Sequence, residues 1–156
     1  MKKLFLLILI LASNLFAQGW NPIVTTGIRD VERTDIFTNS SGIHILIETL
    51  GSDIIYYKLN SEGDVEKTET FETDGSFPNI VGSNDKIFAI YKTGNNIRAK
   101  YSTDNGSTWI WNSNLDRLTS DKDFNGVDAI YEETRGVHAV WGLRDSDQTL
   151  KLIMQG

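Results

Sequence analysis

Cysteine is absent from the 156 residues, and proline occurs only twice. The lack of cysteine excludes disulfide bonds, thiol nucleophiles and cysteine-ligated zinc or iron–sulfur sites. Basic residues are also scarce, because 15 Lys and Arg stand against 21 Asp and Glu, for a formal net charge of −6. They are scattered singly, whereas phosphate recognition needs them in clusters. The composition therefore argues against a nucleic-acid-binding protein and against a polybasic membrane anchor.

Helical periodicity is missing as well. After residue 17, no window longer than ten residues shows the 3.6-residue apolar stripe of an amphipathic helix. Short runs of β-branched and aromatic residues, bounded by turn residues, occur instead. The sequence therefore predicts an all-β protein.

The N-terminus has the features of a secretory signal. Lys2 and Lys3 precede the apolar run Leu4–Ala12, and a cleavage position follows Ala17. Nine apolar residues are too few to span a bilayer, so cleavage is favoured over anchoring. We expect a signal peptide at residues 1–17, an N-terminal strand or linker at 18–32, and a secreted, periplasmic or extracellular protein without a membrane span after cleavage.

Three segments of the chain repeat one pattern. In each, a second apolar run begins seven residues after the first, and the units recur after 44 and 50 residues. The segments are Ile36–Ile47, Ile80–Tyr91 and Ile130–Trp141, and they align without a gap across two strands. The pattern predicts an internal repeat.

Further strands complete each unit. Third strands are predicted at Ile54–Leu59, Ile97–Tyr101 and Leu150–Met154, and fourth strands at Lys67–Phe71 and Trp109–Asn112. Four short strands at this repeat length are typical of a β-propeller blade. We expect a partial β-propeller over residues 33–156, with blades at about 33–74, 75–120 and 121–156, an incomplete ring of two and a half to three blades.

The second strand of each unit is apolar on both faces, which indicates a strand covered from both sides. His44 and His138 occupy equivalent places in the first and third units, and Phe88 takes that place in the second. We expect these rings to fill the space between blades.

One motif is specific. Ser102, Asp104, Gly106, Thr108 and Trp109 match S-x-D-x-G-x-T-W, at the turn between a third and a fourth strand. An Asp accepts hydrogen bonds from turn amides, and a Gly supplies the positive φ of a tight hairpin. The chain therefore resembles the Asp-box (BNR-repeat) propellers, a group that includes the sialidases. The resemblance implies that these residues are a structural turn and not a catalytic site.

No catalytic residue is transferred by the resemblance. Sialidases share an early Phe-Arg-Ile-Pro motif, an arginine triad, an aspartate acid and a tyrosine–glutamate pair. The first motif is absent here, since Arg29 and Arg33 stand in a different context, and the later residues would belong to blades downstream of this sequence.

A calcium loop is the second motif. Asp121, Asp123, Asn125 and Glu132 satisfy D-x-[DN]-x-[DN]-G-x5-E, a ligand pattern for Ca²⁺. The predicted flanks are strands instead of the helices of an EF-hand, so a polar turn is the competing interpretation. On the same face of the predicted fold, Arg144, Asp145 and Asp147 form a candidate ligand surface.

Three functions stay open. The leading hypothesis is an exported Asp-box propeller segment with a non-catalytic recognition role, binding glycans or protein surfaces. The alternatives are the N-terminal part of a sialidase-type glycoside hydrolase and a structural module of a multidomain surface protein. Unpaired sheet edges invite pairing, so we expect either further blades or self-association to close the ring.

Overall fold

The computed structural model describes residues 29–112, 117–118, 123–144 and 150–155. Within these ranges every ladder is antiparallel and no residue is helical, so the all-β prediction is confirmed. No helix suited to crossing a membrane was found in this described part of the chain. The predicted signal peptide and most of the N-terminal strand or linker expected at 18–32 lie outside it.

The strands form three successive sheets. The first sheet contains β1 (Val31–Asn39), β2 (Gly42–Thr49), β3 (Ile54–Leu59) and β4 (Val65–Glu72), paired in that order. The second contains β5 (Gly75–Gly82), β6 (Ile87–Thr93), β7 (Asn96–Ser102) and β8 (Ile110–Trp111), and β9 (Arg117–Leu118) also pairs with β7. The third contains β10 (Asp123–Glu132), β11 (Gly136–Arg144) and β12 (Leu150–Gln155).

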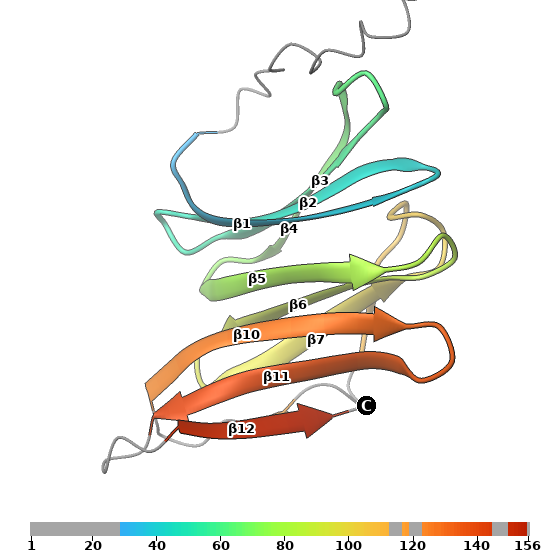
Figure 1. Ribbon diagram of the computed structural model, residues 1–156. Helices are drawn as coiled ribbons and strands as arrows, with labels where there is room; N and C mark the ends of the chain where they lie inside the picture. The colour runs from blue at the N-terminus through green and yellow to red at the C-terminus, as the bar shows by residue number, and fades with distance from the viewer. Residues whose placement is uncertain (1–28, 113–116, 119–122, 145–149, 156) are drawn as a thin grey trace, which may run out of the picture.

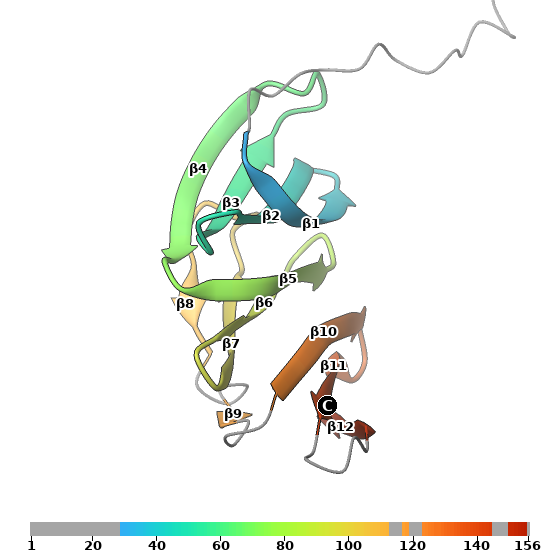
Figure 2. The ribbon, with the colours of Figure 1, turned by 90° about the vertical axis from the view of Figure 1, so that its left-hand side faces the viewer.

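The sheets stack face to face, and none is closed into a barrel. Their first strands, β1, β5 and β10, lie one after another along the same edge of the stack (Figure 1). β4 and β8 lie on the opposite side (Figure 2). Each sheet therefore repeats the strand order and orientation of the one before it.

Two apolar cores hold the stack together. Between the first and second sheets the core contains Leu46, Ile54, Tyr56, Phe71, Ile80, Ile87, Ala89 and Tyr91. Between the second and third sheets it contains Ile90, Ile97, Ala99, Ala129, Val137, Ala139 and Trp141. β6 contributes to both cores, which explains why its sequence lacks the alternation of apolar and polar residues.

The strand register corrects the gap-free alignment of the three units. Thr38 pairs with Ile43 and Gly82 with Ile87, but in the third sheet Tyr131 pairs with Val137, with one more residue in the turn. The residue equivalent to Ile36 and Ile80 is therefore Ala129 and not Ile130. Because a shift of one residue exchanges the faces of a strand, Ile130 points away from the second sheet and is 65% exposed.

Candidate functional site

The first strands of the three sheets line a common groove. Its volume is about 370 Å³, and its walls come from β1, β5 and β10. The lining residues are Asp35, Ile36, Phe37, Asn79, Ile80, Val81, Gly82, Asp128, Ala129, Ile130 and Tyr131. The polar side chains among them are two carboxylates, one amide and one phenol.

Three of these polar residues occupy equivalent positions. Asp35 pairs with Leu46, Asn79 with Ile90 and Asp128 with Val140, and these partners are themselves equivalent in the repeat. We call this set the polar row: Asp35, Asn79 and Asp128. It places one acceptor-bearing side chain of each sheet in the groove.

Asp35 joins the first sheet to the second. Its Oδ2 accepts a hydrogen bond of 2.7 Å from the backbone N–H of Ile80. Its Oδ1 accepts one of 2.9 Å from the N–H of Ile36, its own neighbour. Both carboxylate oxygens therefore satisfy first-strand amides at the groove.

Asn79 joins the second sheet to the third and leaves one atom unpaired. Its Nδ2 donates to Asp128 Oδ1 over 3.3 Å, and the same oxygen accepts from the N–H of Ala129 at 2.9 Å. The Asn79 side chain is only 9% exposed, and its Oδ1 is buried without a hydrogen-bond partner. A buried acceptor without a donor is costly, so this oxygen marks a position where a donor from a ligand would be stabilised.

An ion pair between a buried glutamate and a partly exposed arginine lies near one end of the polar row. Glu48 is 3% exposed and accepts two hydrogen bonds of 2.8 Å from Arg33 and one of 3.0 Å from the N–H of Phe77. These bonds raise the pKa of Arg33 further above its usual value. The Arg33 guanidinium lies 4.6 Å from the centre of the Phe77 ring. The contacts hold Phe77 at a φ of 55°, in a β-bulge of β5.

The Ser102–Trp109 segment forms the turn between β7 and β8. Asp104 accepts from the N–H of Thr108 at 2.8 Å and from its hydroxyl at 2.7 Å, and Ser102 Oγ donates to Asp104 at 2.8 Å. The N–H of Gly106 donates to Ser102 Oγ at 2.8 Å. The bonds from Thr108 and Ser102 lower the pKa of Asp104 to about 2. The carboxylate of Asp104 is thus committed to the turn, as expected for a structural residue.

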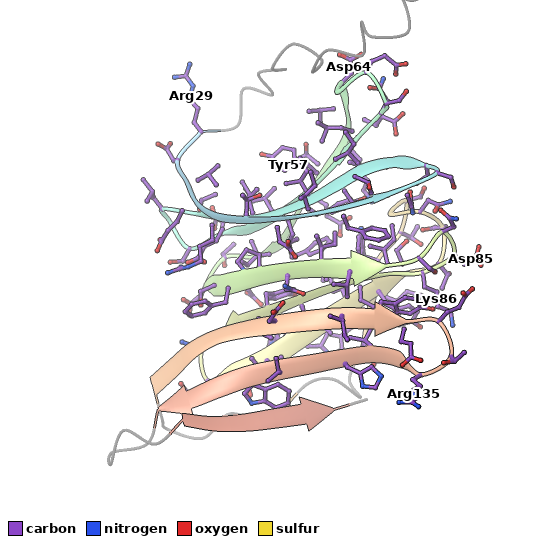
Figure 3. The ribbon with its side chains drawn as sticks, viewed as in Figure 1. Arg29, Tyr57, Asp64, Asp85, Lys86 and Arg135 are labelled. Carbon is purple, nitrogen blue, oxygen red and sulfur yellow. The ribbon has the colours of Figure 1, made fainter. Side chains whose placement is uncertain are left out.

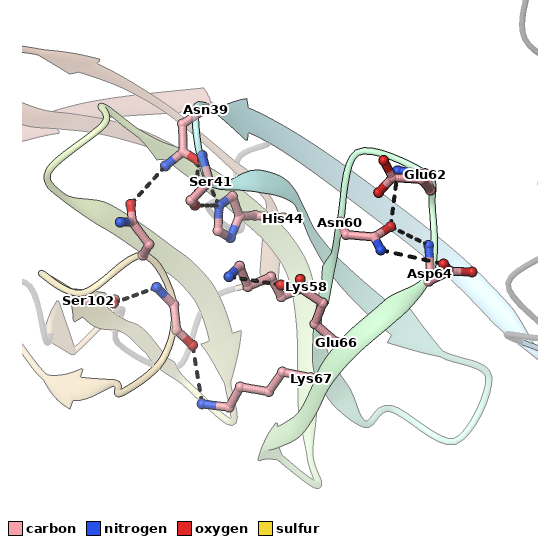
Figure 4. A network of polar contacts seen from close by, with 12 residues as sticks. Asn39, Ser41, His44, Lys58, Asn60, Glu62, Asp64, Glu66, Lys67 and Ser102 are labelled. Atoms are coloured by element: carbon pink, nitrogen blue, oxygen red, sulfur yellow. Dashed lines mark hydrogen bonds and ion pairs between the residues drawn. The ribbon is translucent and has the colours of Figure 1, made fainter.

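This turn also packs against buried side chains of the first sheet. His44 is fully buried, and its Nδ1 lies 2.8 Å from the hydroxyl oxygen of Tyr56. Its Nε2 lies 3.1 Å from Asn39 Oδ1, which can only accept, so Nε2 donates and Nδ1 accepts the Tyr56 proton. Gly106 packs directly on this pair: a Cβ there would overlap the Tyr56 hydroxyl. Figure 4 shows the contacts of His44 with Asn39 and Ser41.

Burial governs the ionisation of the same pair. Burial, followed by the nearby charge of Lys58, lowers the pKa of His44 to about 4. Burial also raises the pKa of the Tyr56 phenol. His44 is therefore a neutral packing residue between two sheets, as its sequence position predicted.

Contacts of the turn with the first sheet continue through Trp109 and Lys67. The Trp109 ring meets Tyr56 and Phe71 edge-on, with centroids 4.9 and 5.0 Å apart. Lys67 Nζ donates to the carbonyl oxygen of Gly106 at 3.2 Å (Figure 4) and to that of Ser107 at 2.6 Å. The turn between β7 and β8 is thus an inter-sheet clamp.

The structure does not bring the four calcium candidates together. Asp123 and Glu132 are the two ends of the ten-residue strand β10, a separation of roughly 30 Å at about 3.3 Å per residue. One Ca²⁺ holds all its ligands within 2.3–2.6 Å, so the proposed set of Asp121, Asp123, Asn125 and Glu132 cannot bind one ion. Asp121 lies outside the described residues, and Asn125 falls within the bulge of β10. Nor do the described residues contain another group of three or more His, Asp or Glu side chains able to hold a metal.

The other candidate ligand surface is only partly placed. Arg144 ends β11 and pairs with Asp123, while Asp145 and Asp147 lie outside the described residues. Arg144 and the β10–β11 turn lie at opposite ends of the third sheet. The Ser102–Trp109 turn of the second sheet corresponds to the end with the β10–β11 turn, so Arg144 lies at the other end of the stack.

Sequence reasoning missed the polar row. The available signal was a polar residue before an apolar pair in the first strand of two units, Asp35 and Asn79. The gap-free alignment placed Ala129 in the third unit at this position, so Asp128 did not join the set. Comparisons with known protein families, with curated proteins and with solved structures find no match for this chain.

Proposed function

We propose that this chain is an exported Asp-box β-propeller segment with a non-catalytic recognition role, and that its groove binds neutral glycans. The observation that carries the proposal is the polar row. Each of three successive sheets contributes an acceptor side chain to one groove, and one of these acceptors is buried without a partner.

Sugar hydroxyl groups fit this arrangement chemically. Hydroxyls donate hydrogen bonds, and the groove offers the carboxylates of Asp35 and Asp128 and the amide oxygen of Asn79 as acceptors. Hydrogen bonds to charged acceptors are the stronger kind. Phe37 and Tyr131 add aromatic surface to the same lining.

Charge favours a neutral ligand over an anionic one. The described residues that line the groove contain two Asp and no Lys or Arg. A carboxylate such as that of sialic acid would face repulsion without a cationic partner. This feature supports binding of neutral sugars and disfavours a sialidase-type site in this part of the chain.

His44, Tyr56 and Asp104 have strongly shifted pKa values, and burial and turn hydrogen bonds account for these shifts where the β7–β8 turn packs on the first sheet. The clamp geometry in turn supports the Asp-box assignment, and the repeated sheets with adjacent first strands support the propeller.

An array of neutral and sialylated oligosaccharides, probed with the labelled protein, tests the proposal. We expect binding to neutral members and its loss in Asn79→Leu, which removes the unpaired oxygen at similar volume. Asn84→Leu is the matched control, since Asn84 lies in the exposed turn after β5 and outside the groove lining.

The outcomes separate the hypotheses. Equal binding by Asn79→Leu and the control would contradict the proposal that the groove is the glycan-binding site. Preference for sialylated members would favour the sialidase-type alternative, and no binding to any member would favour the structural module.

A further inference from the structure

We infer that the chain associates with a second copy of itself head to tail, with the outer face of the third sheet of one copy packed on the outer face of the first sheet of the other. The inference concerns the two ends of the stack and does not depend on a ligand in the groove. It rests on the equivalence between these end faces and the two interfaces inside the chain.

Every sheet has a face that packs on the preceding sheet. In the second sheet this face is Ile80, Ile87, Ala89 and Tyr91, and in the third it is Ala129, Val137, Ala139 and Trp141. The register gives the equivalent residues of the first sheet as Ile36, Ile43, Ile45 and Ile47. This end face is as apolar as the other two. No other sheet of the described residues packs on it. Ile36 is 59% exposed, whereas Ile47 is 2% exposed and Leu59, which pairs with Ile43 on the same side, is 4% exposed. The exposed part of this face therefore centres on Ile36.

The side chain of Tyr57 extends the same face. Tyr57 pairs with Ile45 and therefore lies on its side of the sheet. Figure 3 shows Tyr57 on the outer side of the first sheet, away from the second.

Every sheet also has a face that packs on the following sheet. In the first sheet it includes Asp35, Phe37, His44 and Leu46, and in the second Asn79, Val81, Phe88 and Ile90. The equivalents in the third sheet are Asp128, Ile130, His138 and Val140. They surround an open hollow of about 160 Å³ with an almost wholly apolar lining.

His138 shows what the third sheet lacks. His44, its equivalent, is sealed by Gly106 from the following sheet and hydrogen-bonds through both ring nitrogens. The side chain of His138 is 32% exposed, its Nε2 forms no hydrogen bond, and the Glu132 carboxylate lies 3.9 Å away. In the first and second sheets, the face that contains Asp35 or Asn79 is covered by the following sheet. In the described residues, no sheet covers the equivalent face of the third sheet, which contains Asp128 and His138.

A second copy supplies the missing surface. The apolar face of the first sheet is equivalent to the faces of the second and third sheets that pack on the preceding sheet. Asp128 also stands where Asp35 accepts the N–H of Ile80. Six-residue segments of three strands, the number in the third sheet, cover roughly 300 Å² per copy. This is below the size of stable protein interfaces, so we expect weak association, at concentrations of roughly 100 µM.

Sedimentation velocity from about 5 to 500 µM brackets that concentration. We expect the average mass of the wild-type protein to rise with concentration. Ile36→Glu and Ile130→Glu should each stay monomeric, because a charge buried in an apolar interface is costly. Leu50→Glu is the control: Leu50 is 68% exposed, lies in the β2–β3 turn and belongs to neither face, so this variant should associate as the wild type does.

Mixing the two variants gives the sharpest result. Each retains one intact face, so an equimolar mixture should form a one-to-one dimer that does not grow further. Circular dichroism of each variant at the lowest concentration checks that it is folded. A wild-type monomer throughout the range overturns the inference, as does a mixture of folded variants that remains monomeric.

Discussion

Acid should destabilise this protein through His44 before its carboxylates titrate. The buried ring has a pKa of about 4, against 6.5 in an unfolded chain. Above pH 6.5 both states are neutral at this residue, and it contributes no pH dependence. Between pH 6.5 and 4 the unfolded state binds a proton that the folded state does not, so the free energy of unfolding falls as pH falls.

The size of the effect follows from the two pKa values. Integrated from pH 7.5 to 4.5, the single proton lowers the free energy of unfolding by roughly 2–3 kcal/mol. Against a typical total of about 5–15 kcal/mol, this loss is easily measured by urea denaturation. The ring C–H resonance of His44 should also stay constant from pH 7.5 to about 5 in NMR titrations.

The variant pair His44→Phe with Tyr56→Phe isolates this contribution. Phenylalanine already occupies the equivalent place in the second sheet, at residue 88. Changing both partners avoids leaving a buried hydroxyl unpaired. The double variant should lose this pH dependence, and His138→Phe should keep it. Identical pH profiles for the wild type and the double variant would refute the assignment.

Two further perturbations test the clamp and the metal hypothesis. Gly106→Ala should lower the free energy of unfolding by about 3 kcal/mol, because Gly106 has a φ of 79° and its new Cβ would meet the Tyr56 hydroxyl. Gly94→Ala, at a φ of 52° with open space around it, should cost only about 1 kcal/mol; equal losses in urea denaturation would contradict the packing argument. Addition of calcium or of a chelator should leave the thermal midpoint unchanged, since the ends of β10 cannot share an ion, and a shift of several degrees would show a calcium site of another composition.

Local patterns in the sequence predicted most strands. Runs such as Ile54–Leu59 read as strands because β-branched and aromatic residues between turn residues favour extended backbone. The S-x-D-x-G-x-T-W stretch likewise predicted its own hydrogen bonds, since its partners are at most four residues apart. Hydrogen bonds between residues so close in the sequence can be predicted without knowledge of the fold.

The groove could not be predicted from the sequence, because its residues come from three strands that meet only after the sheets stack. One extra residue in the β10–β11 turn changed which side chains face the groove, and an alignment by apolar spacing could not detect it. The calcium pattern failed for the opposite reason. Its spacing suits a loop, but most of the segment is extended as β10, which separates its first ligands from its last.

The sequence by itself determined the all-β character, the repeated unit and the turn chemistry, because strand propensity and turn hydrogen bonds act between near neighbours. Only the tertiary structure decided which faces are covered, how Gly106 closes over His44, and which acceptors share the groove. These depend on register and on packing between sheets, where contacts join residues about 45 positions apart.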